Sequence, residues 1–193
     1  MKRRTFIAGL ASAAAWPMAV RAQQSAMPVI GVLVPQSVDD AKNFTVAFLQ
    51  GLKETGYVAG QNVAVEYRYA GNQFDRLVAL ADDLVRRRVA VIVAIGASAA
   101  LAAKGATTTI PIVFVTAGDP VALGLVASLN RPGANLTGTA ILAGVLAPKQ
   151  LQLLRELVAN AAVFGVLVDP AFPATPSIIM DLLAAAHAAL IRR

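Results

Sequence analysis

Polar residues follow three apolar segments of the chain at the points where strands are expected to end. Ser37 comes after residues 28–35, Ser98 after residues 90–95, and Asp119 after residues 111–116. A serine hydroxyl beside the free N–H groups of a helix start suits a carboxylate, and an aspartate can hold an amino group. These residue types could hold the charged groups of a ligand. The full candidate set is Gln36, Ser37, Gly96, Ala97, Ser98, Thr116, Ala117, Gly118, Asp119 and Asp169.

Each of these residues also has a purely structural interpretation. Ser98 could be an ordinary helix N-cap. Asp119 followed by Pro120 is the typical start of a helix, with the aspartate at the N-cap and the proline in the first turn. Gly96 and Gly118 would allow a close backbone approach to a ligand, or simply serve turns. Asp169 follows a later apolar run and would face the other residues across a cleft.

A catalytic alternative uses the same serine. Ser98, then Asp119 or Asp169, then His187 occur in the chain order of the triad of an exported α/β serine hydrolase. The residues around Ser98 read GASAA, however, so Ala100 replaces the second glycine of that motif. His187 lies within AAAHAAL, a helical pattern where a surface or packed histidine is expected. A binding site is therefore favoured, with the hydrolase as the rival hypothesis.

The elements that position these residues alternate between apolar runs of strand length and amphipathic stretches. This alternation is typical of βαβ units with parallel strands, whose ligands bind beyond the carboxyl ends of the strands. The sequence thus predicts an α/β fold with a Rossmann-like parallel sheet. Strands are expected at 28–35, 62–69, 90–95, 111–116 and 163–168, and helices after Asp39-Asp40 and at 74–88, 98–104, 121–129, 148–160 and 176–193.

The chain divides into three parts on this pattern. Residues 23–135 hold four strands and form a complete lobe. From residue 136 the small polar run LTGT resembles a segment that crosses between lobes. Residues 136–193 then offer a single strand and two helices, and one strand cannot build a sheet. We expect residues 136–193 to be the hinge crossing and an incomplete second α/β lobe.

The first 22 residues have the pattern of an export signal. Lys2, Arg3 and Arg4 precede an apolar run from Phe6 to Val20, and a cleavage site is expected after Ala22. The pair Arg3-Arg4 suits a twin-arginine signal, although the general export route stays open. The mature protein is expected in the periplasm.

Composition excludes several other classes of protein. The net charge of +6 comes mostly from this leader, since the remainder carries 13 basic and 11 acidic residues, too balanced for a nucleic-acid binder. There is no cysteine, which rules out thiol catalysis and cysteine-bound metals. No G-x-G-x-x-G or P-loop motif is present, so we expect no nucleotide cofactor and no metal.

Several blocks of the chain resemble the ABC-transporter substrate-binding family of the tryptophan/tyrosine type. The matching blocks run in order along nearly the whole chain: 28–33 (PVIGVL), 47–57 (AFLQGLKETGY), 60–68 (GQNVAVEYR), 81–87 (ADDLVRR), 107–115 (TTTIPIVFV), 118–120 (GDP), 124–138 (GLVASLNRPGANLTG) and 152–157 (QLLREL). The resemblance also includes the leader, in Arg3-Arg4-x-Phe and in 19–24 (AVRAQQ).

This resemblance implies a type I periplasmic binding protein. Two α/β lobes would close about a hinge on a small solute, possibly an amino acid, and deliver it to the permease of an ABC importer whose ATPase subunits hydrolyse ATP. The family has two complete lobes, whereas the second lobe here ends early.

Overall fold

The computed structural model describes residues 27–141, 146–158, 160–161, 163–170 and 175–191, without the side chains of residues 188–191. The expected leader, residues 1–22, lies outside the described residues. One five-stranded sheet has the order β2-β1-β3-β4-β5, and all its pairs are parallel. The predicted α/β fold is therefore confirmed. The strands are β1 (Val29–Val34), β2 (Ala64–Tyr69), β3 (Val91–Ile95), β4 (Ile112–Thr116) and β5 (Leu136–Ala140).

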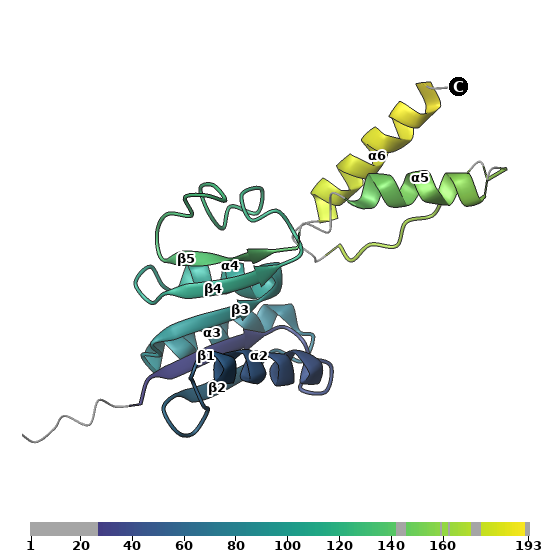
Figure 1. The fold of residues 1–193 in the computed structure, drawn as a ribbon. Helices are drawn as coiled ribbons and strands as arrows, with labels where there is room; N and C mark the ends of the chain where they lie inside the picture. The colour runs from purple at the N-terminus through teal and green to yellow at the C-terminus, as the bar shows by residue number, and fades with distance from the viewer. Residues whose placement is uncertain (1–26, 142–145, 159, 162, 171–174, 192–193) are drawn as a thin grey trace, which may run out of the picture.

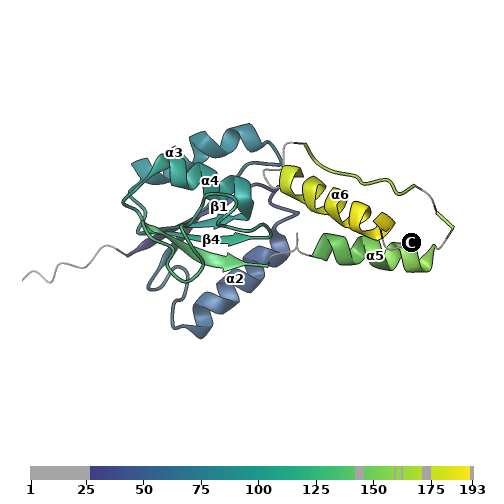
Figure 2. The same cartoon turned by 90° about the horizontal axis from the view of Figure 1, so that it is seen from above.

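Helices cover both faces of this sheet (Figures 1 and 2). Figure 2 shows α2 (Lys42–Glu54) on one face, with α3 (Leu77–Arg86) and α4 (Gly96–Ala106) on the other. Because both faces are covered near the centre, β1 can be apolar along its whole length, and five of its six residues are buried. A short 3-10 helix, η2 (Phe74–Arg76), leads into α3.

Two apolar cores form between the helices and the sheet. On the α2 face, Phe44, Phe48 and Leu52 recur every four residues and pack over Val32 and Val34. On the opposite face lies the larger core, to which α3 and α4 contribute buried side chains: Leu77, Ala81, Leu84, Ala99, Ala100 and Ala103. The small alanines of α4 let that helix lie close to the central strands.

The predicted helix at 121–129 is wrong. The chain forms turns there, in which the Leu123 N–H donates to the Asp119 carbonyl and the Gly124 N–H to the Val121 carbonyl. Gly124 has φ of +66°, so the backbone leaves the helical conformation after a single turn. The Lys104 ammonium donates to the Gly124 carbonyl and ties this loop to the end of α4.

Residues 136–140, expected in the crossing segment, instead form β5 at the edge of the sheet. This strand pairs with β4 from Ile112↔Leu136 to Thr116↔Ala140. Leu136 alone in β5 is buried, so backbone pairing rather than apolar pattern defines the strand. Gly138 lies opposite Phe114, where a Cβ would come within 2.6 Å of the Phe114 Cγ and closer still to its carbonyl oxygen.

The second unit contains two helices, α5 (Ala147–Leu157) and α6 (Thr175–Ile191), which pack on each other. Figure 1 shows them beyond one edge of the sheet. The predicted buried strand at 163–168 is wrong, because this segment pairs with no strand and Leu167 is 100% exposed. A strand needs a neighbour to satisfy its backbone, and the described residues place none beside it.

A network of charged side chains joins the edge strand β2 to α3. Arg68 contacts Glu66 at 3.1 Å and Asp83 at 2.8 Å, and Arg87 donates to Glu66 at 2.8 Å. The hydrogen bond from Arg87, supported by Arg68, holds the pKa of Glu66 below its ordinary value. Arg68, followed by Arg86, does the same for the pKa of Asp83. Within the basic run at 86–88, Arg86 and Arg87 therefore serve intramolecular ion pairs.

Replacing Gly138 by alanine is expected to destabilise the fold by about 3 kcal/mol. The added methyl would overlap the Phe114 backbone, and the pairing of β4 with β5 keeps the two residues from moving apart. Chemical denaturation would measure the loss. The matched control is Gly51→Ala in α2, where no atom lies within 4 Å of the added methyl and stability should rise by about 0.5–1 kcal/mol. Equal behaviour of the two variants would contradict the described β4–β5 pairing.

The Glu66 network is expected to make stability depend on acid pH. Because its folded pKa is depressed, Glu66 stabilises the fold above its unfolded pKa of roughly 4.3, and this contribution disappears as pH falls through the lower folded value. The melting temperature of the Glu66→Gln variant should therefore fall less steeply below about pH 5 than that of the parent. Glu54→Gln, at the end of α2 and outside the network, should keep the parent's slope.

Candidate functional site

The candidate residues lie at the carboxyl edge of the sheet, where three adjacent strands end. From β1 the chain moves to β2 on one side, then returns to β3 on the other, so the strand order reverses between β1 and β3. Loops diverge at such a point and leave room for a ligand. The pair Ile95↔Val115 brings the ends of β3 and β4 level, so Gly96 and Thr116 follow side by side.

The start of α4 is the central feature of this edge. The helix begins at Gly96 directly after β3, and no side chain caps its N-terminus. Gly96 has φ of +82°, which allows the abrupt change from strand to helix. The N–H groups of a first helical turn lack partners within the helix, and the helix dipole adds positive potential there. Ala97 is buried and Ser98 is half-buried, so this start can accept an anion.

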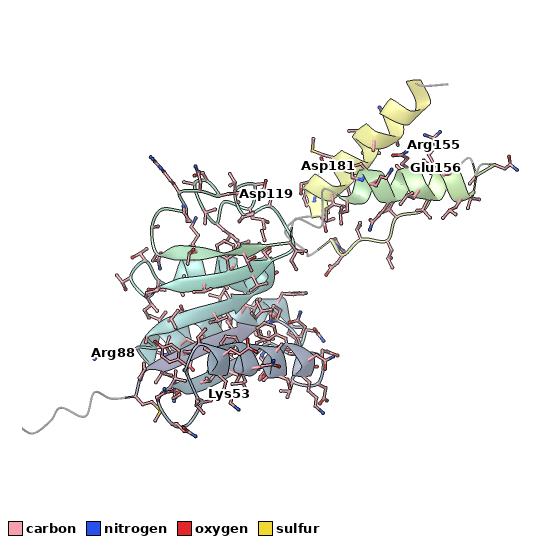
Figure 3. The ribbon with its side chains drawn as sticks, in the orientation of Figure 1. Lys53, Arg88, Asp119, Arg155, Glu156 and Asp181 are labelled. Atoms are coloured by element: carbon pink, nitrogen blue, oxygen red, sulfur yellow. The ribbon has the colours of Figure 1, made fainter. Side chains whose placement is uncertain are left out.

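The loop after β4 lies next to it. Thr116 is buried, and its hydroxyl oxygen accepts the Gly118 N–H at 3.2 Å. Ala117 and Asp119 are exposed. The Asp119 Oδ1 accepts the N–H groups of Val121 at 2.8 Å and Ala122 at 3.4 Å, which are the contacts of an N-cap, although a single turn rather than the predicted helix follows. Figure 3 shows Asp119 on the side from which the chain leaves toward α5, opposite Arg88.

The loop after β1 lies beside the start of α4. A Cβ on Gly96 would lie 3.9 Å from the Pro35 Cγ, so this loop borders the start of α4. Gln36 is exposed, and Ser37 is half-buried. The Ser37 hydroxyl donates to the Asp40 Oδ2 at 2.6 Å and accepts the Asp40 N–H at 3.3 Å, so it holds the turn that precedes α2.

Asp40 and Asn72 belong to this edge, although the sequence analysis did not include them in the site. The Asn72 side-chain amide donates to the Asp40 Oδ2 at 3.1 Å, and its backbone N–H donates to the Pro35 carbonyl at 2.8 Å. The hydroxyl of Ser37, then the amide of Asn72, hold the pKa of Asp40 below its usual range. The Ser-x-x-Asp spacing signals the first contact, whereas nothing local signals the second.

The remaining predicted residue, Asp169, belongs to the second unit. It is exposed, and its carbonyl accepts the Thr175 hydroxyl at 2.6 Å. Next to it an apolar cavity of about 630 Å³ lies between α5, α6 and residues 163–168, and it contains none of the predicted site residues. The side chains that line it are Leu151, Arg155, Ala161, Phe164, Val166, Val168, Ile179, Leu182, Leu183 and Ala186.

The geometry does not support the hydrolase hypothesis. A catalytic serine on a nucleophile elbow sits in a strained turn. Ser98 instead lies in the first turn of a regular helix and is not among the described residues with positive φ. His187 is exposed on α6, which extends away from the sheet in both ribbon views.

Neither a metal site nor a membrane span is found in the part of the chain that the structure describes. No three His, Cys, Asp or Glu side chains gather there in a way that could hold a metal ion. Among the same residues, no helix has both the length and the apolar character needed to cross a membrane.

The described residues thus form an α/β lobe whose candidate site lies at the carboxyl edge of a parallel sheet. Across residues 29–191 the chain matches the ABC transporter substrate binding protein family, and it belongs to that family. A similar curated protein is the tyrosine-binding protein of Clostridioides difficile (strain R20291), 34% identical over 133 residues. That match covers 69% of this chain and 37% of the relative.

Solved structures share the same architecture. A conserved domain protein from Vibrio cholerae has a TM-score of 0.74 at 28% identity, covering 83% of this chain and 54% of that one. An ABC domain from Streptococcus pneumoniae in complex with L-Trp has a TM-score of 0.74 at 24% identity, covering 84% and 54%. A substrate-binding protein with adhesive properties from Clostridium difficile, in a ligand-free open form, has a TM-score of 0.61 at 26% sequence identity. The chain spans about half the length of these structures.

Asp119→Ala is expected to lower the stability of the chain by about 1 kcal/mol, because the N–H groups of Val121 and Ala122 lose their acceptor. Asp119→Asn keeps an oxygen at the capping position and should lose much less. Thermal unfolding without ligand separates the two variants. If both were as stable as the parent, the capping role would be refuted.

Proposed function

We propose that this chain is the solute-binding component of an ABC importer and captures an amino acid at the carboxyl edge of its sheet. The observation that carries the proposal is the uncapped start of α4, placed beside the point where the strand order reverses. This arrangement offers N–H donors and a positive helix end to a carboxylate. The proposed contacts are those of the sequence analysis: Gln36, Ser37, Gly96, Ala97, Ser98, Thr116, Ala117, Gly118, Asp119 and, from the second unit, Asp169.

The ligand's two charged groups would take different places on this edge. Its carboxylate lies against Gly96, Ala97 and the Ser98 hydroxyl. Its amino group faces the loop after β4, where Asp119 uses one carboxylate oxygen for capping and keeps the other for a ligand. The names of the relatives support an amino acid, since one is a tyrosine-binding protein and another was solved with L-Trp.

The wider transport role follows from family membership and from the leader. After removal of residues 1–22 the protein would act in the periplasm, with the second lobe closing on the solute about a hinge that follows β5. An ABC permease would receive the solute, and its ATPase subunits would supply the energy. No enzymatic step is assigned to this chain, since binding and release suffice for that role.

The test is calorimetric titration of the 193-residue chain with L-tyrosine and L-tryptophan. We expect binding of at least one, and about tenfold weaker binding for Ser98→Ala, because a hydrogen bond to a charged group contributes about 1.5–3 kcal/mol. Tyramine, which lacks the carboxylate, should not bind. The control Ser128→Ala changes a half-buried serine outside the proposed site, in the loop before β5, and should bind like the parent.

Two results would contradict the proposal. If no amino acid bound the parent chain, amino-acid capture would be refuted. If tyramine bound as tightly as L-tyrosine and Ser98→Ala had no effect, the start of α4 would not be the carboxylate site.

A further inference from the structure

The hydroxyl of Ser37 has its single hydrogen committed within the protein. It donates to the Asp40 Oδ2 at 2.6 Å and accepts the Asp40 N–H at 3.3 Å. Because the pKa of Asp40 is lowered by these contacts, its side chain is an ionised carboxylate at neutral pH, which only accepts hydrogen bonds. A serine oxygen has two lone pairs, and the Asp40 N–H uses one of them. Ser37 therefore has one lone pair left for a ligand and no hydrogen to donate.

The loop after β2 fixes this arrangement from the other side. The Asn72 side-chain amide donates to the same Asp40 Oδ2 at 3.1 Å, and the Asn72 backbone N–H donates to the Pro35 carbonyl at 2.8 Å. Asn72 has φ of +64°, a left-handed conformation in which asparagine is enriched. Both bonds start from one residue, so Asn72 ties the Asp40 carboxylate, and through it the Ser37 hydroxyl, to the loop after β1.

Ser98 has the opposite polarity. Within the part of the chain that the structure describes, its hydroxyl takes part in no hydrogen bond, so its hydrogen is available to a ligand. Ser98 lies in the first turn of α4, where free N–H groups and the helix dipole favour an anion. A hydroxyl that can donate in this position suits a carboxylate, which only accepts. The two serines thus suit ligand groups of opposite kind.

The sheet brings these two serines to the same level. In the pairing of β1 with β3, Leu33 lies opposite Ala94, and Ser37 and Ser98 each come four residues after this pair. The chain continues from β1 to α2 and from β3 to α4, and these helices cover opposite faces of the sheet (Figure 2). Neighbouring strands lie about 4.8 Å apart, a spacing that the two charged groups of one α-amino acid can bridge through hydrogen bonds. A ligand at this edge has one serine on either side.

We propose that Ser37 accepts a hydrogen bond from the ligand's ammonium group, while Ser98 donates to its carboxylate. Asp40 and Asn72 are the positioning residues that set the polarity of Ser37. These roles rest on the proposed amino-acid capture at the same edge and add which end of the ligand each loop binds. An ammonium has three donors, so it can contact Ser37 as well as Asp119. The Asp40 carboxylate behind Ser37 also repels a ligand carboxylate, so the site selects zwitterions over simple carboxylates.

The test compares L-tyrosine and L-tryptophan with their des-amino analogues, which keep the carboxylate and lack the amino group. Dissociation constants are measured on the 193-residue chain by calorimetry or, for weak binding, by ligand-observed NMR. Ser37→Ala should weaken amino-acid binding about tenfold and leave the analogue unchanged, because only the ammonium loses a charged hydrogen bond. Ser98→Ala should weaken both ligands alike. The control Ser128→Ala, in the loop before β5, should change neither.

Two further variants test the positioning residues through the ratio of the two dissociation constants. Asn72→Gly keeps the left-handed backbone and its N–H but removes the side-chain amide, so the amino acid alone should bind about threefold more weakly. Asp40→Ala frees the Ser37 hydrogen for a carboxylate, so the preference for the amino acid over the analogue should fall about tenfold. A variant that only loosened the fold would weaken both ligands together and keep the ratio.

The outcomes separate the polarity of Ser37 from the proposed function itself. If the parent bound an amino acid and Ser98→Ala weakened it, but Ser37→Ala kept the parent's ratio, amino-acid capture would stand and the role of Ser37 would be refuted. An unchanged ratio in Asp40→Ala and Asn72→Gly would refute their positioning role. If neither amino acid bound the parent, both the capture and the assigned polarity would be overturned.

Discussion

The parallel pairing of β1 with β3 is the interaction on which the rest of the structure depends. In this pairing Ile30 lies opposite Val91 and Leu33 opposite Ala94. The chain therefore crosses from β2, on one side of β1, to β3 on the other side. Parallel neighbours require a covering helix in each crossover, and α2 and α3 therefore fall on opposite faces of the sheet. The same pairing places the reversal of strand order beside the start of α4. Packing, topology and the location of the candidate site thus have one origin.

Much of this lobe could be predicted because most of its strands have a recognisable sequence pattern. β1, β3 and β4 are short apolar runs, and burial on both faces is what such runs require. β5 could not be predicted in the same way, because Leu-Thr-Gly-Thr-Ala gains its conformation from pairing with β4 rather than from burial. The reverse error occurred at 163–168, where the side chains have the pattern of a strand and the neighbouring strand is missing from the described residues.

In the candidate site, too, the features set by neighbouring residues could be predicted, whereas those that join distant residues could not. Positions 36–37, 96–98 and 116–119 follow from the rule that parallel strands end at one edge, and the structure brings these three loops together. Local spacing also explains the turn contacts of Ser37 and Asp119. The contact from Asn72 to Asp40 joins residues 32 positions apart, and only the folded arrangement of β1 and β2 creates it. Asp169, on the second unit, stays a prediction.

The alanine surface of α4 has a consequence for how firmly its N-terminal end is held. Ala97, Ala99, Ala100 and Ala103 are all buried, and an alanine has no rotamers to lose. The fully buried face of the helix therefore consists of methyl groups and backbone, and Leu101 packs beside it as a partly buried side chain. A ligand docking there would meet a preorganised surface, and little of its binding free energy would be spent on immobilising the receptor.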